Sequence, residues 1–313
     1  MNRSLENKFS VITCTYNPDL PRLKRVMKAV EEMGRGHAME YLIVDNHSNP
    51  ALANQFNESF AFYNIIPESK QGLAHARLTG VEHASGEWIV FMDDDNVPQI
   101  DYLNALQKII SENPQVGIWG PGEIEVEFEK EPELWVKKYF MSAFQQKKQI
   151  STEFGTSTEW PSYFPAGSGM CVRKDVFLDY ALKWKNGAYA VTGRKGNTLS
   201  SGEDAQLIWN ATKNGIPVGS SPLLKLTHLI PEKRTSLTYL KNLYFHLSQG
   251  YYQAKEQVFG WTAIENEKPK RLTYVKKWIN CVVKTGFHFT HSQKVFQIEK
   301  EWLKGFPNHK PLQ

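Results

Sequence analysis

Short apolar runs alternate with segments of helical periodicity through the first hundred residues. Apolar residues recur every three or four positions over residues 20–33 and 74–84, which predicts two helices. Runs rich in β-branched and aromatic residues predict strands before, between and after these helices. The predicted strands are residues 9–15, 41–44, 63–66 and 88–92. Strands that alternate with helices in this order are typical of a parallel sheet in an α/β fold.

The pattern is less regular beyond residue 100. Residues 123–160 are charged and aromatic with weak periodicity, and the chain has no internal repeat. Small residues over 165–170 predict a loop. The other predicted elements are a helix over 101–113, a strand and turn over 116–121, a strand over 170–172, a helix over 205–213 and a last strand over 223–227 that ends in His228.

Three consecutive aspartates, residues 93–95, follow the predicted strand 88–92. That strand is apolar throughout, as in a parallel sheet buried on both faces, and such sheets bind ligands at the carboxyl ends of their strands. Thr15 and Asp45 end two earlier strands and are expected at the same edge. Adjacent carboxylates repel each other unless a cation lies between them, and Mg²⁺ is often held by one or two carboxylates plus substrate phosphates. The cluster therefore indicates metal-assisted chemistry on a phosphate-bearing substrate, against the alternative of a helix cap or turn.

Composition places the chain among soluble globular proteins. Of its 313 residues, 41% are hydrophobic and 22% are charged, and no apolar stretch approaches the roughly 18 residues of a membrane span. Residues 1–8 are polar and predict no secretion signal. Cys14, Cys171 and Cys281 are few and widely separated, which predicts a reducing compartment without disulfides. The cytoplasm is therefore the expected location.

Charge is distributed unevenly along the chain. Residues 233–313 contain 14 Lys and Arg, 5 Glu and no Asp, a formal charge of +9, whereas the whole chain carries +4. Within this tail a helical wheel over residues 272–284 gives one apolar side, formed by Leu272, Val275, Trp278, Ile279, Val282 and Val283, and an opposite side with Lys276, Lys277 and Lys284. Two interpretations follow: peripheral contact with an anionic membrane, or packing on the chain's own domain or on the second subunit of a homodimer. Charge of this size occurs on any solvated helical face, so nucleic acid is not an expected partner.

Seven short motifs occur in a fixed order over residues 8–231. They are Thr15-Tyr16-Asn17-Pro18, Asp45-Asn46-His47-Ser48, Gly72-Leu73-Ala74-His75-Ala76-Arg77, Gly86-Glu87-Trp88 with Asp93-Asp94-Asp95, Gly167-Ser168-Gly169-Met170, Glu203-Asp204 and His228-Leu229-Ile230-Pro231. In this order they resemble family 2 glycosyltransferases of the GT-A fold. The resemblance implies a Rossmann-like, mixed but mostly parallel sheet flanked by helices. It also implies that residues 1–100 bind the nucleotide sugar, residues 101–232 complete the same domain around the acceptor, and residues 233–313 form a helical extension.

The resemblance further implies the chemistry of the donor site. The donor would be a nucleotide-diphosphate sugar, with a UDP-sugar favoured, and a divalent cation, Mn²⁺ or Mg²⁺, would stabilise the charge of the leaving diphosphate. Asp95 would bind this cation, with Asp93 and His228 as further ligands. The implied nucleotide-binding residues are Thr15, Tyr16, Asn17, Asp45, Ser48, Arg77, Asp93 and Asp94.

On the acceptor side, Asp204 resembles the general base of the family, and Glu203 is the second candidate. One base in line with the leaving group implies direct displacement with inversion of configuration. The acceptor would be a hydroxyl of a glycan or of a lipid-linked sugar, and the enzyme a hexosyltransferase of surface polysaccharide synthesis. The candidate acceptor or sugar loop comprises Gly167, Ser168 and Gly169 with Trp160, and further aromatic candidates for stacking on a sugar ring are Trp135, Tyr163 and Phe164.

Two other functions fit parts of the sequence. An apolar strand followed by residues 93–97 also resembles the first motif of haloacid-dehalogenase-like phosphatases, in which the first Asp is the nucleophile. Those proteins carry this motif on their first strand, whereas two strands with polar ends precede it here. A catalytically inactive sugar-nucleotide-binding scaffold is the other alternative. The presence of both the aspartate cluster and Glu203-Asp204 argues against it.

Overall fold

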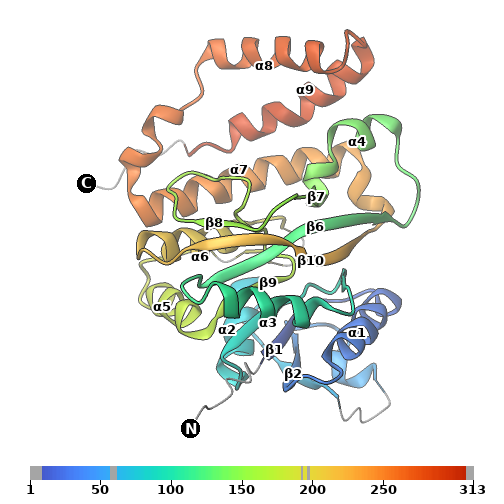
Figure 1. Cartoon of the computed structure of the whole chain (residues 1–313). Helices are drawn as coiled ribbons and strands as arrows, with labels where there is room; N and C mark the ends of the chain where they lie inside the picture. The colour runs from blue at the N-terminus through green and yellow to red at the C-terminus, as the bar shows by residue number, and fades with distance from the viewer. Residues whose placement is uncertain (1–8, 57–61, 192, 196–197, 308–313) are drawn as a thin grey trace.

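The computed structural model describes residues 9–56, 62–191, 193–195 and 198–307. The polar start of the chain, for which no secretion signal was expected, lies outside these residues. A twisted mixed sheet forms the centre of the molecule, and three C-terminal helices lie beyond one end of it (Figure 1). The expected α/β architecture is therefore confirmed.

Eight strands form the main path of the sheet. In chain order they are β1 (Phe9–Thr15), β2 (Met39–Asp45), β3 (Asn64–Pro67), β4 (Trp88–Phe91), β5 (Asn96–Pro98), β6 (Ile118–Phe128), β9 (Met170–Arg173) and β10 (Val218–Ile230). Their order across the sheet is β3-β2-β1-β4-β9-β6-β10-β5. The pairings among β3, β2, β1 and β4 and between β6 and β10 are parallel, and β9 and β5 pair antiparallel with their neighbours. Two short strands, β7 (Lys147–Lys148) and β8 (Glu153–Gly155), add to β6 and β10.

The register of the parallel strands brings the polar strand ends together. Thr15 at the end of β1 lies opposite Asp45 at the end of β2, and Ile12 of β1 lies opposite Phe91 of β4. The segment that follows β4 carries the aspartates past the same edge. The predicted gathering of strand-end residues is thus present in the structure.

Helices cover both faces of the sheet. Alternate residues of a strand point to opposite faces, so Ile12 and Ile89 join one buried cluster while Val11 and Val90 join the other. The first cluster includes α2 (Leu73–His83), α5 (Lys174–Lys185) and α6 (Glu203–Lys213), and the second includes α1 (Leu20–Gly34) and α3 (Tyr102–Glu112). The apolar stripes predicted over residues 20–33, 74–84, 101–113 and 205–213 are these helices.

Two strand predictions were too short. A turn was expected at Gly120-Pro121, yet β6 continues through both residues to Phe128. Proline is tolerated because Pro121 lies opposite Ser221, where the register of β6 and β10 is irregular. The last strand, predicted over 223–227, extends through His228, which therefore lies within β10.

The described part of the tail, residues 233–307, forms three α-helices, and one of them covers the amphipathic stretch noted at residues 272–284. They are α7 (Leu237–Phe259), α8 (Arg271–Lys284) and α9 (Phe289–Lys304). α7 packs against α6 and α9, while α8 packs on α9 at the outer end of the molecule (Figure 1). A third buried cluster joins α7 and α9 to the end of β10 and to α4 (Leu134–Tyr139). No helix in the described part of the chain is both long and apolar enough to cross a bilayer.

Candidate active site

A cavity of about 1430 Å³ opens at the carboxyl ends of β1 and β4. It extends from the aspartate cluster past the start of α6 to one face of α7. Ligand sites of α/β sheets lie at this edge. The predicted site residues that line the cavity are Thr15, Tyr16, Asn17, Arg77, Asp93, Asp94, Asp95, Trp160, Gly167, Ser168, Glu203, Asp204 and His228.

Asp95 is the most heavily engaged carboxylate of the cluster. Its Oδ2 accepts a 2.6 Å hydrogen bond from Arg234 Nη1, and its Oδ1 accepts one from the side-chain amide of Asn96 and lies 3.6 Å from His228 Nε2. Burial alone would raise the pKa of Asp95, but the charges of Arg234 and His228 outweigh burial and hold it below its usual value. Asp95 is therefore ionised across the physiological range.

Asp94 has the opposite electrostatic environment. Burial, followed by the negative charge of Asp95, raises the pKa of Asp94 to about 6, although the Thr15 hydroxyl donates a 2.5 Å hydrogen bond to its Oδ2. Two neighbouring carboxylates thus differ in how readily they take up a proton. Shifted pKa values of this kind are frequent at functional sites, where charged groups are buried close to one another.

His228 presents one ring nitrogen to the cluster. Its Nδ1 lies 2.8 Å from the carbonyl oxygen of Phe144, in the short 3-10 helix η2 (Met141–Phe144). A carbonyl can only accept, so Nδ1 carries a proton, and Nε2 is the ring nitrogen that faces Asp95. Metal-binding histidines commonly have this arrangement, in which a backbone carbonyl fixes the tautomer.

The loop before β9 connects the aspartate cluster with the start of α6. The Ser168 hydroxyl donates to Asp93 Oδ2 at 3.0 Å, and the backbone N–H of Gly167 donates to Asp204 Oδ2 at 3.0 Å. The loop therefore spans from the aspartate cluster to the start of α6. Gly169 does not belong to the lining in the described part of the structure; its φ of +67° and the 2.5 Å hydrogen bond from Tyr102 to its carbonyl give it a backbone role.

Glu203 and Arg77 form a buried pair beside this loop. Arg77 Nη1 lies 3.5 Å from Glu203 Oε1, and the guanidinium also lies 5.0 Å from the centroid of the Phe91 ring. Glu203 Oε2 has no hydrogen-bond partner among the described residues. Burial, followed by the charge of adjacent Asp204, raises the pKa of Glu203 to about 7. Near neutral pH Glu203 is thus divided between its protonated and ionised forms.

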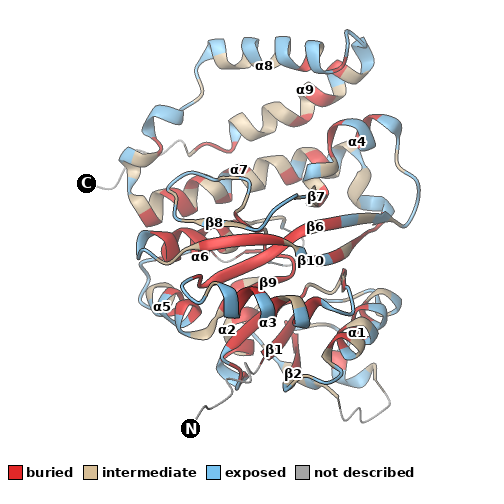
Figure 2. Ribbon diagram, in the orientation of Figure 1, coloured by how far each residue is buried: buried red, intermediate tan, exposed pale blue. Residues whose placement is uncertain are grey.

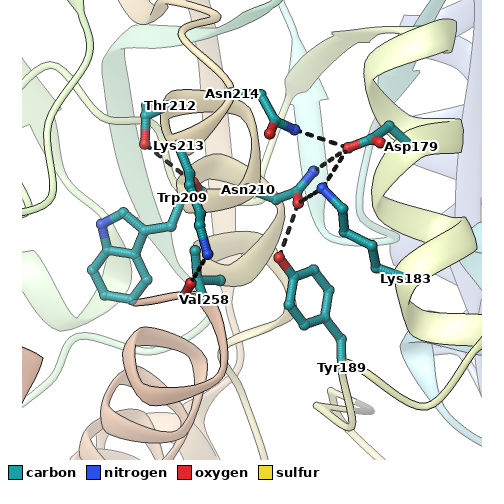
Figure 3. Close-up of polar contacts among 9 residues, drawn as sticks. All are labelled: Asp179, Lys183, Tyr189, Trp209, Asn210, Thr212, Lys213, Asn214 and Val258. Atoms are coloured by element: carbon teal, nitrogen blue, oxygen red, sulfur yellow. Dashed lines mark hydrogen bonds and ion pairs between the residues drawn. The ribbon is translucent and has the colours of Figure 1, made fainter. Parts of the chain in front are cut away.

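A polar network holds α6 in place behind these acids (Figure 3). Buried Asn210 donates to Asp179 Oδ2 at 2.8 Å, and its Oδ1 accepts from Lys183 at 2.8 Å and from Tyr189 at 2.9 Å. Exposed Asn214 donates to the same Asp179 oxygen at 3.0 Å. The network ties α6 to α5 and so fixes the position from which Glu203 and Asp204 project.

Asp45 and Ser48 lie in a turn next to the cavity, where their side chains accept hydrogen bonds from the backbone. Both Asp45 oxygens accept from backbone N–H groups, those of Ser48 at 3.0 Å and of Leu52 at 2.7 Å. The Ser48 hydroxyl accepts from the backbone N–H of Asn17 at 2.9 Å. Neither Asp45 nor Ser48 is part of the described cavity lining, whereas neighbouring Asn46 is. Their geometry supports the turn that holds Asn17, and base recognition by Asp45 stays a prediction.

The aromatic candidates separate by burial. Trp135 is only 1% exposed and packs in the cluster between α4 and the C-terminal helices, so the prediction that it stacks on a sugar ring is wrong. Phe164 is likewise buried. Trp160 is 37% exposed and lines the cavity, with its ring packed edge-on against Phe164 and Trp209.

Sequence reasoning missed the contribution of the tail and of two arginines. One face of α7 and the last turn of α9 form a wall of the cavity, through Tyr239, Asn242, Leu243, His246, Leu247, Tyr251 and Trp302. Arg194 and Arg234 also line it. The tail is basic, but nothing local in the sequence distinguishes Arg234 from the other basic residues around it.

Comparison with known proteins gives a consistent result. The model of the family described as glycosyl transferase family 2 matches residues 10–177. A glycosyltransferase of Haemophilus influenzae is 30% identical over 120 residues, which are 37% of this chain and 40% of that protein. The glucosyl-dolichyl phosphate glucuronosyltransferase of Haloferax volcanii is 22% identical over 251 residues, 78% of this chain and 75% of the relative. The chain thus spans less than half of the length of the Haemophilus influenzae protein.

The crystal structure of GalNAc-T7 with UDP, GalNAc and Mn²⁺ superimposes with a TM-score of 0.53 at 14% identity, over 90% of this chain and 58% of that one. At this identity the likeness concerns the fold alone, and it confirms the expected GT-A fold. The family match spans β1 to β9 and contains the aspartate cluster, so it decides against the phosphatase alternative. From the order of its motifs, its fold and this match together, the chain belongs to glycosyl transferase family 2 and is a glycosyltransferase.

Proposed function

We propose that this glycosyltransferase moves a hexose from a nucleotide-diphosphate sugar, with a UDP-sugar favoured, to a hydroxyl group with inversion of configuration. The observation that carries the proposal is the arrangement of acids around one cavity. The aspartate cluster lies at one end, Asp204 lies at the start of α6, and the loop at Gly167 and Ser168 hydrogen-bonds to both. A donor and an acceptor held in this cavity would meet beside that loop.

The donor end has groups suited to a diphosphate and its cation. Arg194, Lys233 and Arg234 supply positive charge along the lining. Within residues 9–56, 62–191, 193–195 and 198–307 no three His, Cys, Asp or Glu side chains converge as a complete metal site. Asp95 and the fixed Nε2 of His228 are two suitable donors, and a hard cation that also binds substrate phosphates needs few protein ligands. The residues therefore fit Mn²⁺ or Mg²⁺, which would supply charge stabilisation to the departing diphosphate.

Asp204 is the proposed general base. Its two oxygens accept from the backbone N–H groups of Gly167 and Ala205, which fix the carboxylate at the edge of the cavity. A base in this position takes the proton of the acceptor hydroxyl as its oxygen attacks the anomeric carbon, and the diphosphate leaves from the opposite face. Glu203 is buried and paired with Arg77, so we assign it a positioning role.

The wall formed by α7 and α9 is the proposed acceptor side. Tyr239, Tyr251 and Trp302 offer aromatic surface, while Asn242 and His246 offer hydrogen-bonding groups. Sugar rings bind through this combination, because their C–H faces pack on aromatic rings and their hydroxyls need polar partners. A glycan or lipid-linked acceptor of surface polysaccharide synthesis at the cell envelope is therefore proposed.

Calorimetric titration with UDP, GDP, dTDP and CMP, with and without Mn²⁺, tests the donor site. We expect one nucleotide to bind in a metal-dependent manner and to lose at least tenfold in affinity in Asp95→Ala. Asp101→Ala is the matched control, because Asp101 is exposed and lies outside the cavity lining. Equal binding by both variants, or no binding of any nucleotide, would contradict the proposal. Binding without sugar transfer to any acceptor would favour the inactive scaffold.

A further inference from the structure

Six large apolar side chains are exposed along the outer surface of the α8–α9 hairpin. They are between 53% and 78% exposed and comprise Leu272, Val275, Ile279, Val283, Phe287 and Phe289, which we call the α8 apolar face. The first four recur at intervals of three or four residues, so they form one stripe along α8. Phe287 lies in the turn before α9, and Phe289 is the first residue of α9.

The α8 apolar face is not the side by which α8 packs on the protein. That inner side carries Trp278, whose ring lies 5.2 Å from the ring of Phe296 of α9, and buried Cys281. Figures 1 and 2 show α8 as the outermost helix, with exposed residues along its length. The apolar residues predicted to share one side of this helix therefore divide between an inner packing surface and an outer exposed one.

Positive charge surrounds the α8 apolar face. From Lys268 to Ile298 the chain has seven Lys and Arg and no Asp or Glu. The exposed basic residues of this stretch on α8 and in the segment before it are Lys268, Lys270, Arg271, Lys276 and Lys284. The acid that α9 brings to α8 is Glu299, which pairs with Lys277 at 3.1 Å and Lys284 at 3.0 Å. The other basic groups are left to face solvent beside the stripe.

We propose that the α8 apolar face binds the surface of an anionic lipid bilayer. Exposed aliphatic and aromatic side chains on a helix can enter the boundary between headgroups and acyl chains, while neighbouring lysines bind anionic headgroups. Both features occur together on α8. The combination fits an interfacial helix that lies in the plane of the membrane.

A second copy of the chain fits this surface less well. In a two-fold dimer the same surface meets itself, so the basic residues around Lys276 would face their own copies without an acid between them. Like charges in that position oppose association, whereas an anionic bilayer supplies the missing negative charge. Charge complementarity therefore favours an anionic bilayer over a second copy of the chain as the partner of this surface.

Flotation of the full-length protein with phosphatidylcholine vesicles, with or without about 30% phosphatidylglycerol, tests the proposal. We expect the wild type to bind the anionic vesicles, with an affinity that falls as salt is added. Ile279→Ser/Val283→Ser should bind at least tenfold more weakly, because two aliphatic side chains can no longer insert into the bilayer. Leu178→Ser/Leu182→Ser is the matched control: both leucines are exposed on α5, away from α8, and their loss should leave binding unchanged.

A charge variant tests the contribution of the basic residues separately from that of the apolar stripe. Lys276→Glu should weaken binding to anionic vesicles severalfold, while Lys108→Glu on the exposed side of α3 should not. Absence of vesicle binding by the wild type, or equal binding by Ile279→Ser/Val283→Ser, would overturn the proposal. So would a concentration-dependent dimer, seen by sedimentation equilibrium and lost in that variant, because a second copy would then be the occupant. The vesicle measurement does not depend on sugar transfer.

Discussion

Arg234 donates a 2.6 Å hydrogen bond to Asp95 in the described structure, and the pair is largely shielded from solvent. The guanidinium thus balances the charge of the carboxylate that is proposed to bind the cation. Burial opposes a charged Arg234, but the charge of Asp95 outweighs burial and raises the pKa of Arg234 above its usual value. A bound diphosphate would offer Arg234 a second acceptor in the same cavity.

Replacement of Arg234 by glutamine should separate the two roles. Because Asp95 loses its cationic partner, we expect Arg234→Gln to bind Mn²⁺ alone more tightly than the wild type. The same variant should bind the nucleoside diphosphate roughly ten- to a hundredfold more weakly, since a charge-assisted hydrogen bond contributes about 1.5–3 kcal/mol. Titration calorimetry measures both affinities.

Arg25→Gln is the control for this experiment. Arg25 makes an exposed ion pair with Glu127 and does not line the cavity, so both affinities should stay unchanged. If Arg234→Gln left nucleotide affinity at the wild-type value, Arg234 would have only a structural role.

Asp204→Asn should lower the turnover number by a factor of roughly 10²–10⁴, the range ascribed to general base catalysis. Nucleotide binding should stay near the wild-type value, because the amide keeps the shape of the carboxylate. Comparison of transfer rates with nucleotide affinity tests this, with Asp101→Asn as the control. Normal turnover in Asp204→Asn would remove it as the base and direct attention to Glu203.

The raised pKa of Glu203 predicts a pH-dependent stability. Between its unfolded value of 4.5 and its native value of about 7, the folded protein binds more protons at Glu203 than the unfolded chain does. This group therefore makes the free energy of unfolding fall as pH rises through that interval. Thermal unfolding at several pH values should show a flatter profile for Glu203→Gln than for the wild type. Glu112→Gln, an exposed change on α3, should reproduce the wild-type slope.

His246 offers a test of the acceptor wall. Its Nδ1 is buried and has no partner among the described residues, although the residue lines the cavity. We expect His246→Ala to raise the KM for the acceptor about tenfold, since a hydrogen bond is lost, and to leave nucleotide affinity unchanged. Gln249→Ala on the exposed side of α7 is the matched control. Equal acceptor KM values for both variants would place the acceptor elsewhere.

The sequence predicted the part of the site that is formed by residues at the ends of individual strands. Thr15 and the aspartate cluster end short buried strands, and such strands are recognised by their apolar runs. The wall contributed by α7 was missed because it depends on long-range packing: Tyr239 and Trp302 are far apart in sequence and line the same cavity only because α7 packs against α9. Pro121 was misassigned for a related reason, since its place in β6 depends on the irregular pairing with Ser221.

The network behind α6 predicts a difference between two asparagines of the same helix region (Figure 3). Asn210 is buried and hydrogen-bonds Asp179, Lys183 and Tyr189, so Asn210→Ala should lower the free energy of unfolding by about 2–3 kcal/mol. Asn214 is exposed and gives Asp179 one hydrogen bond, so Asn214→Ala should cost less than about 1 kcal/mol. Urea unfolding measures both values. Because the network also positions Glu203 and Asp204, Asn210→Ala should slow sugar transfer at temperatures where the variant remains folded. Equal losses of unfolding free energy in the two variants would mean that α6 is held by its apolar contacts alone.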